Sequence, residues 1–236
     1  HGSDFHRNWA HQTISQNTVL VNGKGQRSVG PFAQGKIDDF KLTPEWDYVL
    51  GNAVDAYEGR LKKANRHILF VKPDIIVIYD DLEAPEEADF QFMLHSLSEF
   101  ELPSSSTAEL HIQRPGAGAL IQYHGSLPVK FRQWDGFDPQ PERRQFPNNW
   151  HLETSTATKA KEVQMFTVIA PHRGKDRPEL KVERIQSASA NGLKLNINGR
   201  LTVVGFRKGV TGKAELSGVT FESPVLVQVA QDSATK

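Results

Sequence analysis

Side chains able to exchange protons, bind carboxylates or stack on rings are concentrated at the start of this chain of 236 residues. His6 and Arg7 are adjacent, and Trp9 and His11 follow directly. A histidine with a pKa near neutrality exchanges protons with a ligand, and an arginine pairs with a carboxylate through two hydrogen bonds. An indole ring offers a broad apolar face with one polar edge. Together these residue types favour a catalytic or binding site, with His6 as the candidate catalytic residue.

Each of these residues also has a structural interpretation. His6 and Arg7 could be a solvated pair near a chain terminus, and Trp9 could cover the edge of a β-sheet. The elements that position them decide between the two. An apolar strand over 17–22 follows at once and ends at Asn22-Gly23, so we expect the cluster at the edge of a sheet.

The rest of the chain is dominated by strand patterns. The runs 66–71 and 75–79 are β-branched and flank a turn with a proline, which predicts a hairpin covered on both faces. Asn198-Gly199 predicts a second hairpin. Further strands are expected at 108–113, 119–124, 127–132, 161–169, 179–185 and 224–230. Asp80 and Asp81 must point to opposite faces of a strand, so we interpret them as solubilising charges at a hairpin end.

Many short strands with Gly, Pro and Asn between them predict an all-β fold, an antiparallel β-sandwich of two large sheets with very little helix. A short helical piece is expected within 44–55, and a long ordered loop over 131–149. A minor seam falls at 172–178. A second domain after it would be small, so we predict a single domain over 1–236.

Composition excludes several classes of function. Lysine plus arginine and aspartate plus glutamate both number 28, so bulk charge does not favour binding to nucleic acid or an anionic membrane. The chain has no cysteine, which excludes disulfides and thiolate metal sites. No apolar run is long enough to span a bilayer, and no signal peptide is visible.

A family resemblance is carried by motifs in the first 170 residues or so. Residues 2–13 read Gly-Ser-x-x-His-x-x-Trp-x-x-Gln-Thr, and 17–26 read Asn-Thr-Val-Leu-Val-Asn-Gly-Lys-Gly-Gln. The other matching segments are 55–61, 66–81, 92–95 and 148–152. In this order they resemble the C-terminal module of heparinase II/III-like polysaccharide lyases, most closely the oligo-alginate (exo-type) branch.

The resemblance implies that an α/α-toroid domain precedes this sandwich and that the substrate cleft lies between the two. Such enzymes cleave uronic-acid polysaccharides by β-elimination, which needs a carboxylate partner, a base and an acid. The resemblance places the principal His and Tyr pair on the helical domain, so the isolated chain is expected to be inactive. The implied partners are an acidic polysaccharide and that helical domain, and the parent is implied to be periplasmic or secreted.

Some members of the family bind a metal, zinc or calcium, through a histidine just before Asn-Thr-Val. This chain has Gln16 there, and an amide is a poor zinc ligand beside imidazole or carboxylate. We therefore predict no metal or other cofactor in this chain.

The resemblance also extends the candidate site. The expected substrate-binding residues are Arg7, Trp9, His11, Gln16, Trp150 and His151. Gln16 could bond sugar hydroxyls or satisfy backbone groups at the strand start. Trp150 and His151 follow the long loop, so they face a cleft or pack that loop on the sandwich.

A different class of protein remains open at this point, a stand-alone carbohydrate-binding or adhesion β-sandwich without catalysis. It should present a strip of exposed aromatic rings, whereas a lyase module should present a broad face where its helical partner docks. A third possibility is a purely structural domain that touches no sugar.

Overall fold

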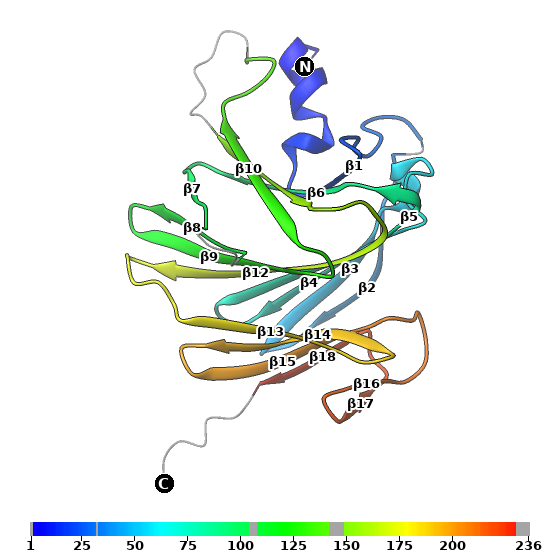
Figure 1. Cartoon of the computed structure of the whole chain (residues 1–236), viewed down its shortest axis with the longest axis vertical. Helices are drawn as coiled ribbons and strands as arrows, with labels where there is room; N and C mark the ends of the chain where they lie inside the picture. Colours follow the sequence, from blue (N-terminus) through cyan, green and yellow to red (C-terminus); the bar gives the residue numbers. More distant parts are fainter. Residues whose placement is uncertain (1, 32, 104–107, 142–148, 230–236) are drawn as a thin grey trace.

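The computed structural model describes residues 2–31, 33–103, 108–141 and 149–229. It confirms the predicted all-β antiparallel fold, with 59% strand and 6% helix. The sheets are stacked in three layers, and the broad middle sheet is covered on each side by a smaller one (Figure 1). The expectation of two large sheets is thereby refined to one large sheet between two sheets of four strands.

The middle sheet is antiparallel and has eight strands. In spatial order they are β2 (Lys36–Leu42), β3 (Trp46–Asn52), β4 (Lys63–Val71), β5 (Ile75–Ala88), β12 (Ala160–Arg173), β9 (Ala117–Gly125), β8 (Glu109–Arg114) and β7 (Phe100–Glu101). The predicted hairpin over 66–79 is formed by β4 and β5, with Val71 opposite Ile75.

The two outer sheets have four strands each. The upper sheet of Figure 1 is ordered β1 (Val19–Val21), β6 (Phe90–Ser96), β11 (Trp150–Thr156) and β10 (Val129–Asp135). The lower sheet is ordered β13 (Leu180–Gln186), β14 (Ala190–Ile197), β15 (Arg200–Arg207) and β18 (Val225–Val229). A small hairpin of β16 (Ala214–Leu216) and β17 (Val219–Phe221) packs beside the lower sheet.

Helical structure is limited to short pieces in the described residues. They are η1 (His6–Ala10), η2 (Thr13–Ser15) and η3 (Val54–Tyr57). None of them has the length and apolarity that crossing a membrane requires.

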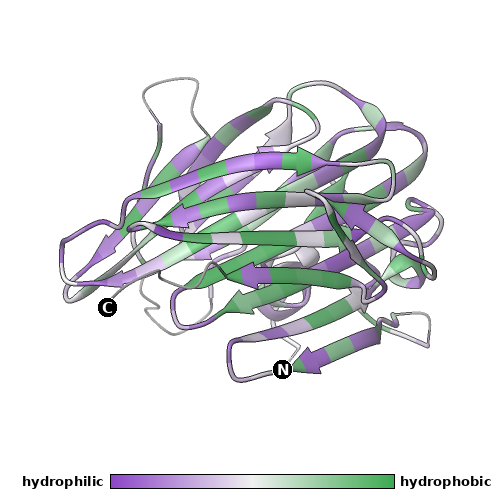
Figure 2. Ribbon diagram, turned by 90° about the horizontal axis from the view of Figure 1, so that it is seen from below, coloured by the Kyte–Doolittle hydropathy of each residue, from purple (hydrophilic) through white to green (hydrophobic). Residues whose placement is uncertain are grey.

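The centre of the middle sheet, strands β5 and β12, is buried on both faces because long stretches of these strands are apolar. On β12, Met165 points to the core under the upper sheet and Phe166 to the core over the lower sheet. Figure 2 shows the resulting long hydrophobic stretches in the inner strands. Each large side chain that is fully buried here stabilises the fold by about 2 kcal/mol.

The lower sheet shares its core with the middle sheet. Leu193 and Phe206 of the lower sheet belong to the same buried cluster as Leu69 and Val77 of the middle sheet. This shared core supports the prediction of a single domain, which stays a prediction.

Two expectations about local structure were wrong. Residues 46–52 form strand β3, not a helix, because Thr43 makes a tight turn in which its hydroxyl donates to the carbonyl oxygen of Trp46 at 2.6 Å. The first part of the expected long loop, Val129–Asp135, is strand β10. The loop begins at Gly136, and residues 142–148 of it lie outside the described part of the chain.

Asp80 and Asp81 were also misinterpreted as solubilising charges. Both lie inside β5 and are only 2% and 8% exposed. As predicted from the pleat, they point to opposite faces, and each has its own cation. Asp80 pairs with Arg66 at 2.7 Å and Asp81 with Lys63 at 3.0 Å.

The Asn198-Gly199 hairpin is confirmed. It joins β14 to β15, with Ile197 directly opposite Arg200. Asn198 and Gly199 have φ of 50° and 91°, the left-handed backbone that a two-residue hairpin requires and that Asn and Gly adopt at low cost.

Candidate functional site

The residues at the amino end are held against the upper sheet by Trp9. Trp9 lies in helix η1 and is only 6% exposed. Its ring centroid is 4.8 Å from that of His151 on β11 and 5.9 Å from that of Phe137, which follows β10. Because η1 is anchored by this aromatic contact, its exposed residues have a defined place on the surface (Figure 1).

His151 is buried, at 1% exposure, and it contacts a second histidine. Its Nδ1 is 2.8 Å from Nδ1 of His95 on β6, and its Nε2 is 2.6 Å from the carbonyl oxygen of Gly136. We call Trp9, His95, Trp134, Phe137 and His151 the N-terminal cluster. It is built where β6, β10 and β11 lie side by side, on the outer face of the upper sheet.

Three of the predicted site residues lie at the surface near η1. His6 and Arg7 belong to this helix, and His11 follows its last residue. Arg7 and His11 are exposed, and His6 is partly exposed. The rings of His6 and His11 are 4.0 Å apart, centroid to centroid. Partial desolvation and the nearby His11 lower the pKa of His6, so His6 is suited to accept a proton near neutral pH.

Gln16 is exposed beside this helix and is tied to its neighbours. Its amide nitrogen donates to Oγ of Ser15 at 3.0 Å and to the carbonyl oxygen of Ala10 at 3.4 Å. These bonds connect Gln16 to the end of η1. They leave its carbonyl oxygen as the group that the structure could offer to a ligand.

Trp150 is separated from the rest of the predicted site. It neighbours His151 on β11, so its side chain points to the opposite face of the upper sheet and packs against the core. The structure thus brings Trp9, His151, His6 and His11 into one region and places Trp150 elsewhere. The roles assigned to all seven residues stay predictions.

His95 was not among the predicted site residues. Its contact with His151 depends on β6 and β11 being neighbours in a register that sets these two residues opposite each other. No local pattern in the sequence reveals that pairing.

The described residues do not present a metal site. No group of three or more His, Cys, Asp or Glu side chains in the described part of the chain is placed to hold an ion. Gln16 turns its amide nitrogen to protein acceptors, and a nitrogen that donates hydrogen bonds is no ligand. The absence of a metal from this chain stays a prediction.

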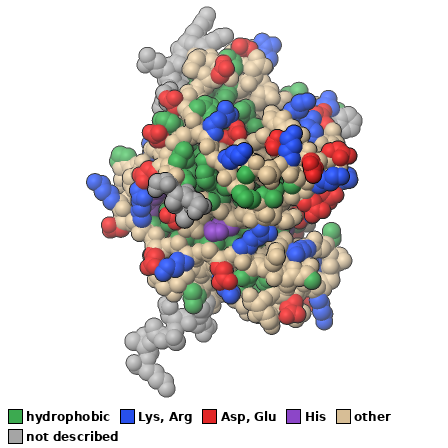
Figure 3. All heavy atoms as spheres, viewed as in Figure 1, with side chains coloured by type: hydrophobic (Ala, Val, Ile, Leu, Met, Phe, Trp, Pro, Cys, Tyr) green, Lys and Arg blue, Asp and Glu red, His purple; other side chains and the backbone are tan. Residues whose placement is uncertain are grey.

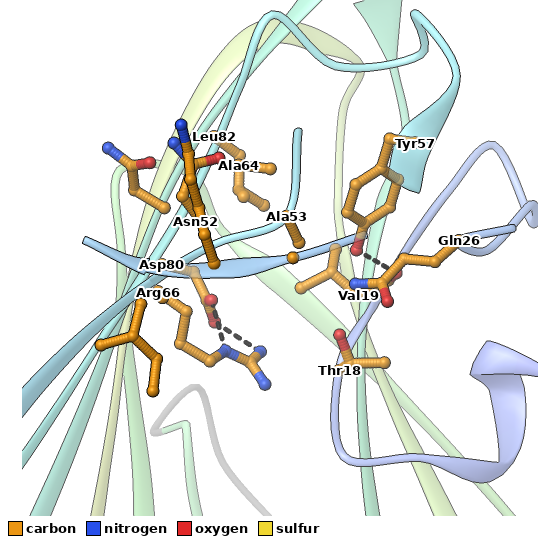
Figure 4. Close-up of a pocket in the computed structure, with 15 residues that line it drawn as sticks. Thr18, Val19, Gln26, Asn52, Ala53, Tyr57, Ala64, Arg66, Asp80 and Leu82 are labelled. Carbon is orange, nitrogen blue, oxygen red and sulfur yellow. Dashed lines mark hydrogen bonds and ion pairs between the residues drawn. The ribbon is translucent and has the colours of Figure 1, made fainter. Parts of the chain in front are cut away.

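A pocket of about 330 Å³ lies at the other edge of the upper sheet, between β1 and the strands β2–β4 (Figure 4). Thr18, Val19 and Gln26 line one side, and Asn52 and Ala53 line the side opposite (Figure 4). The volume suits a small ligand or a few side chains of a docked segment.

Arg66 and Asp80 form the polar floor of this pocket (Figure 4). Nε and Nη2 of Arg66 donate to the two carboxylate oxygens of Asp80 at 2.7 and 2.9 Å, and Nη1 donates to the carbonyl oxygen of Asn17. Burial acts to lower the pKa of Arg66, but the neighbouring Asp80 raises it, so Arg66 stays charged. The hydrogen bond from Arg66 to the carbonyl oxygen of Asn17 holds the start of β1 over the middle sheet.

Tyr57 closes the pocket on the side of β1. Its hydroxyl donates to the carbonyl oxygen of Val19 at 2.8 Å, and burial raises the pKa of Tyr57. The tyrosine is therefore protonated and committed to a backbone acceptor. This contact fits a structural role better than a catalytic one.

An uncovered apolar surface continues from the pocket across β2. Ile37, Phe40 and Leu42 are 69%, 67% and 73% exposed. The pattern of β2, in which Ile37, Phe40 and Leu42 alternate with charged residues, is that of a half-buried strand, yet its apolar side lies bare.

The register shows which way this side faces. Phe40 is opposite Val49, and Val49 is opposite Ile68. The same row continues through β5 and β12 to Tyr123, which is buried under the upper sheet. Residues directly opposite each other share a face. The apolar side of β2 therefore faces the layer of the upper sheet, beyond the point where that sheet ends.

We call Ile37, Phe40, Leu42, Val49 and Ile68 the open apolar face. Among the described residues, the core under the upper sheet contains none from β2 or β3. Figure 3 shows apolar side chains gathered in the middle of the molecule and charged side chains around them. A surface of this kind is typical of an interface.

The family model of heparinase II/III-like C-terminal domains matches residues 1–188. Among curated proteins, no sequence matches this chain.

Several solved structures have a similar fold. The "Heparinase III-BT4657 gene product" superposes with a TM-score of 0.69 at 16% identity, over 86% of this chain and 31% of that one. The heparan sulfate lyase HepC from Pedobacter heparinus gives a TM-score of 0.67 at 15% identity, over 86% of this chain and 32% of that one. The chain thus spans about a third of the length of these structures, and at such identities the likeness shows the fold alone.

Proposed function

Because the chain belongs to the family of heparinase II/III-like C-terminal domains, we propose that it forms one wall of the substrate cleft of a polysaccharide lyase. The substrate would be a uronic-acid polysaccharide, alginate-like or heparin-like. In the β-elimination a base removes the C5 proton and the electron pair forms the C4=C5 double bond. The C4–O glycosidic bond breaks as this double bond forms, and an acid protonates the leaving oxygen. The principal base and acid would come from a helical domain of the same polypeptide.

The observation that carries this proposal is the open apolar face. A lyase module must bury such a surface against its helical partner, whereas a carbohydrate-binding sandwich needs exposed rings. Phe40 is the one aromatic residue among the large, clearly exposed hydrophobic side chains of the described part of the chain, and its neighbours on this face are aliphatic. The surface therefore favours a docked module over a stand-alone binding sandwich.

Within this proposal the amino end supplies auxiliary contacts at the cleft rim. Arg7 would pair with a uronate carboxylate through its fork of donors, and His6 would exchange a proton with a sugar oxygen. His11 and Gln16 would bond hydroxyl groups. Trp9 and His151 are buried, so they would shape the wall more than touch the sugar, and Trp150, on the opposite face of the sheet, would support it from the core. We further propose that the parent protein is periplasmic or secreted, where such polysaccharides occur.

A lyase assay tests the proposal. The isolated chain and a longer polypeptide that includes the residues its gene encodes ahead of His1 are each incubated with alginate and with heparan sulfate. Unsaturated uronate is followed by its ultraviolet absorbance. We expect no turnover by the isolated chain and turnover by the longer polypeptide, because acid and base need mutual placement near hydrogen-bonding distance.

Matched variants connect the assay to the open apolar face. Phe40→Lys in the longer polypeptide should lower turnover at least tenfold, because a charge would be buried at the interface. Leu201→Lys replaces an exposed apolar residue of the lower sheet, 54% exposed, and should leave turnover unchanged. Robust turnover by the isolated chain would overturn the assignment of the chemistry to the helical domain. Tight glycan binding by the isolated chain, with no lyase activity in either form, would favour the carbohydrate-binding alternative.

A further inference from the structure

The contact between His95 and His151 fixes the position of ring protons. A backbone carbonyl can only accept a hydrogen bond, so Nε2 of His151, 2.6 Å from the oxygen of Gly136, carries a proton. A neutral imidazole carries one proton, so Nδ1 of His151 is an acceptor. Nδ1 of His95, 2.8 Å away, must then be the donor. The two rings form a directed relay from His95 through His151 to Gly136.

The relay connects three separate parts of the chain. Gly136 is the first residue of the loop after β10, and it is itself anchored by its N–H, which donates to the carbonyl oxygen of Asn149 at 3.0 Å. On the other side, the backbone N–H of His95 donates to Oδ1 of Asn17 at 3.0 Å. The carbonyls of Ile14 and Gln16 raise the pKa of His95, whose Nε2 is buried and makes no hydrogen bond with the described residues.

Trp9 completes the connection, since its ring packs on His151. A single pair of imidazoles therefore joins the amino-terminal segment 9–17 to the loop after β10, through the outer face of the upper sheet.

We propose that His95 and His151 are positioning residues, whose directed hydrogen bonds set where the segment carrying His6, His11 and Gln16 lies relative to the loop after β10. The relay goes beyond the cleft-wall function and is testable without any glycan. It holds while each ring carries one proton. A second proton on His151, at Nδ1, would set two N–H groups against each other at 2.8 Å, and the contact would open.

Burial favours the singly protonated form of both rings at neutral pH, and with it the hydrogen bond between His95 and His151. Burial and the neighbouring His151 lower the pKa of His95 to about 4, and burial lowers the pKa of His151. The carboxylate of Asp135 acts on His151 in the opposite direction.

The other charged groups around the relay lie at its rim. Arg132 stacks on Trp134 with 4.7 Å from its guanidinium carbon to the ring centroid, and it pairs with Glu153 at 2.9 Å. His6, Arg7 and His11 lie on and just after helix η1. The proton count of the relay follows from the geometry at His95, His151 and Gly136.

Ring tautomers measured on the unmodified chain test the relay directly. Long-range ¹H–¹⁵N correlation spectra distinguish a protonated from an unprotonated ring nitrogen. At pH 7 we expect His151 in the Nε2–H form and His95 in the less common Nδ1–H form. Finding His95 in the Nε2–H form, or either ring doubly protonated at pH 7, would overturn the proposal.

Variants separate positioning from simple packing. In His151→Gln the amide nitrogen reaches toward the position of Nε2 and can donate to Gly136 without titrating. The readout is the part of the fluorescence that disappears in Trp9→Phe, followed with pH beside far-ultraviolet circular dichroism. In the unmodified chain we expect Trp9 to become exposed on acidification before the dichroism changes. In His151→Gln we expect this exposure to shift downward by a pH unit or more.

His172→Gln is the control, because His172 belongs to a separate pair with His111 on the middle sheet, Nε2 to Nε2 at 2.9 Å. It should leave the Trp9 transition in place. Equal midpoints in the unmodified chain and His151→Gln, or coincident loss of dichroism and Trp9 burial, would contradict the relay as a positioning device.

Discussion

The N-terminal cluster lies on the outer face of the upper sheet and the open apolar face on strands β2–β4 of the middle sheet, and the two regions differ in how far their contacts are complete. In the cluster, Trp9 is 6% exposed and His151 is 1% exposed, and the histidine nitrogens between the rings have partners. On the apolar face, Phe40 and Leu42 are 67% and 73% exposed. The first region is packed within the chain, whereas the second has the composition of a core without its cover.

This difference separates two kinds of evidence for function. Histidines and tryptophans attract attention in a sequence, yet Trp9 and the His151 ring that it packs on are buried and hold the amino-terminal segment in place. The apolar side of β2 carries no chemistry, and it is the stronger pointer to a partner. The uncovered surface is therefore better evidence for a docked partner than the reactive side chains are.

Acidification should give the largest effect, and it acts on the buried histidines. Burial lowers the pKa of His67 to about 3, and burial lowers that of His95 to about 4. In the unfolded chain these rings take up protons below about pH 6.5. The unfolded state then binds more protons than the folded state, so stability falls as pH drops from about 6.5 to about 4.

The expected loss by pH 4 is about 3 kcal/mol for His67 and less for His95, whose ring is partly exposed to solvent. Urea unfolding between pH 7 and pH 4 measures it, and His67→Phe should flatten the dependence by about half. A stability that stays constant over this range would show that the rings are not held neutral. The hydrogen bond between His95 and His151, which needs neutral rings, would then lose its physical basis.

Removing the cation under the pocket should give the next largest effect. Arg66→Ala leaves the carboxylate of Asp80, 2% exposed, without its cation and frees the carbonyl oxygen of Asn17. The free energy of unfolding should fall by about 3–5 kcal/mol. Lys159→Ala, which removes a surface pair with Asp89 at 3.8 Å, is the control and should cost less than about 1 kcal/mol. Equal costs for the two variants would mean that the pocket floor is not a buried ion pair.

Trp9→Ala tests the packing of the N-terminal cluster. It should cost about 3 kcal/mol of local stability, since a large ring is removed from between His151 and Phe137. Hydrogen exchange at 6–17 should rise while the middle sheet keeps its protection. Uniform loss of protection over the whole chain would contradict a cluster that is local to the amino end.

Phe40→Lys should give the smallest effect on the isolated chain. Because the ring of Phe40 is already in water, the free energy of unfolding should change by less than about 0.5 kcal/mol. Leu201→Lys should behave in the same way. A cost of several kcal/mol for Phe40→Lys alone would show that the ring is covered within this chain, and the contrast between the two regions would disappear.

The fold was largely predictable because its signals are local. Asn198-Gly199 fixes a hairpin by backbone preference, and the apolar runs of β4 and β5 require cover on both faces. The third layer was not predictable, because nothing local tells a strand which side of the middle sheet it will cover. The expectation of a helix within 44–55 failed for the same reason. The residues that could open a helix there form a turn between strands β2 and β3.

The candidate site was predictable only in part. His6, Arg7, Trp9 and His11 were found because they are close in sequence. His95 and the pair of Arg66 with Asp80 were missed, because strand register brings their members together from distant positions. The open apolar face was missed for another reason, since an alternating strand gives no sign of whether its apolar side finds a cover.

Hydrogen exchange at β2 tests the central claim most directly, that the open apolar face is where the rest of the lyase docks. The amides of Ile37–Leu42 are compared in the isolated chain and in the longer polypeptide, and those of β15 serve as the reference. The account predicts at least tenfold slower exchange at β2 in the longer polypeptide and no change at β15. Equal exchange at β2 in both forms would contradict it.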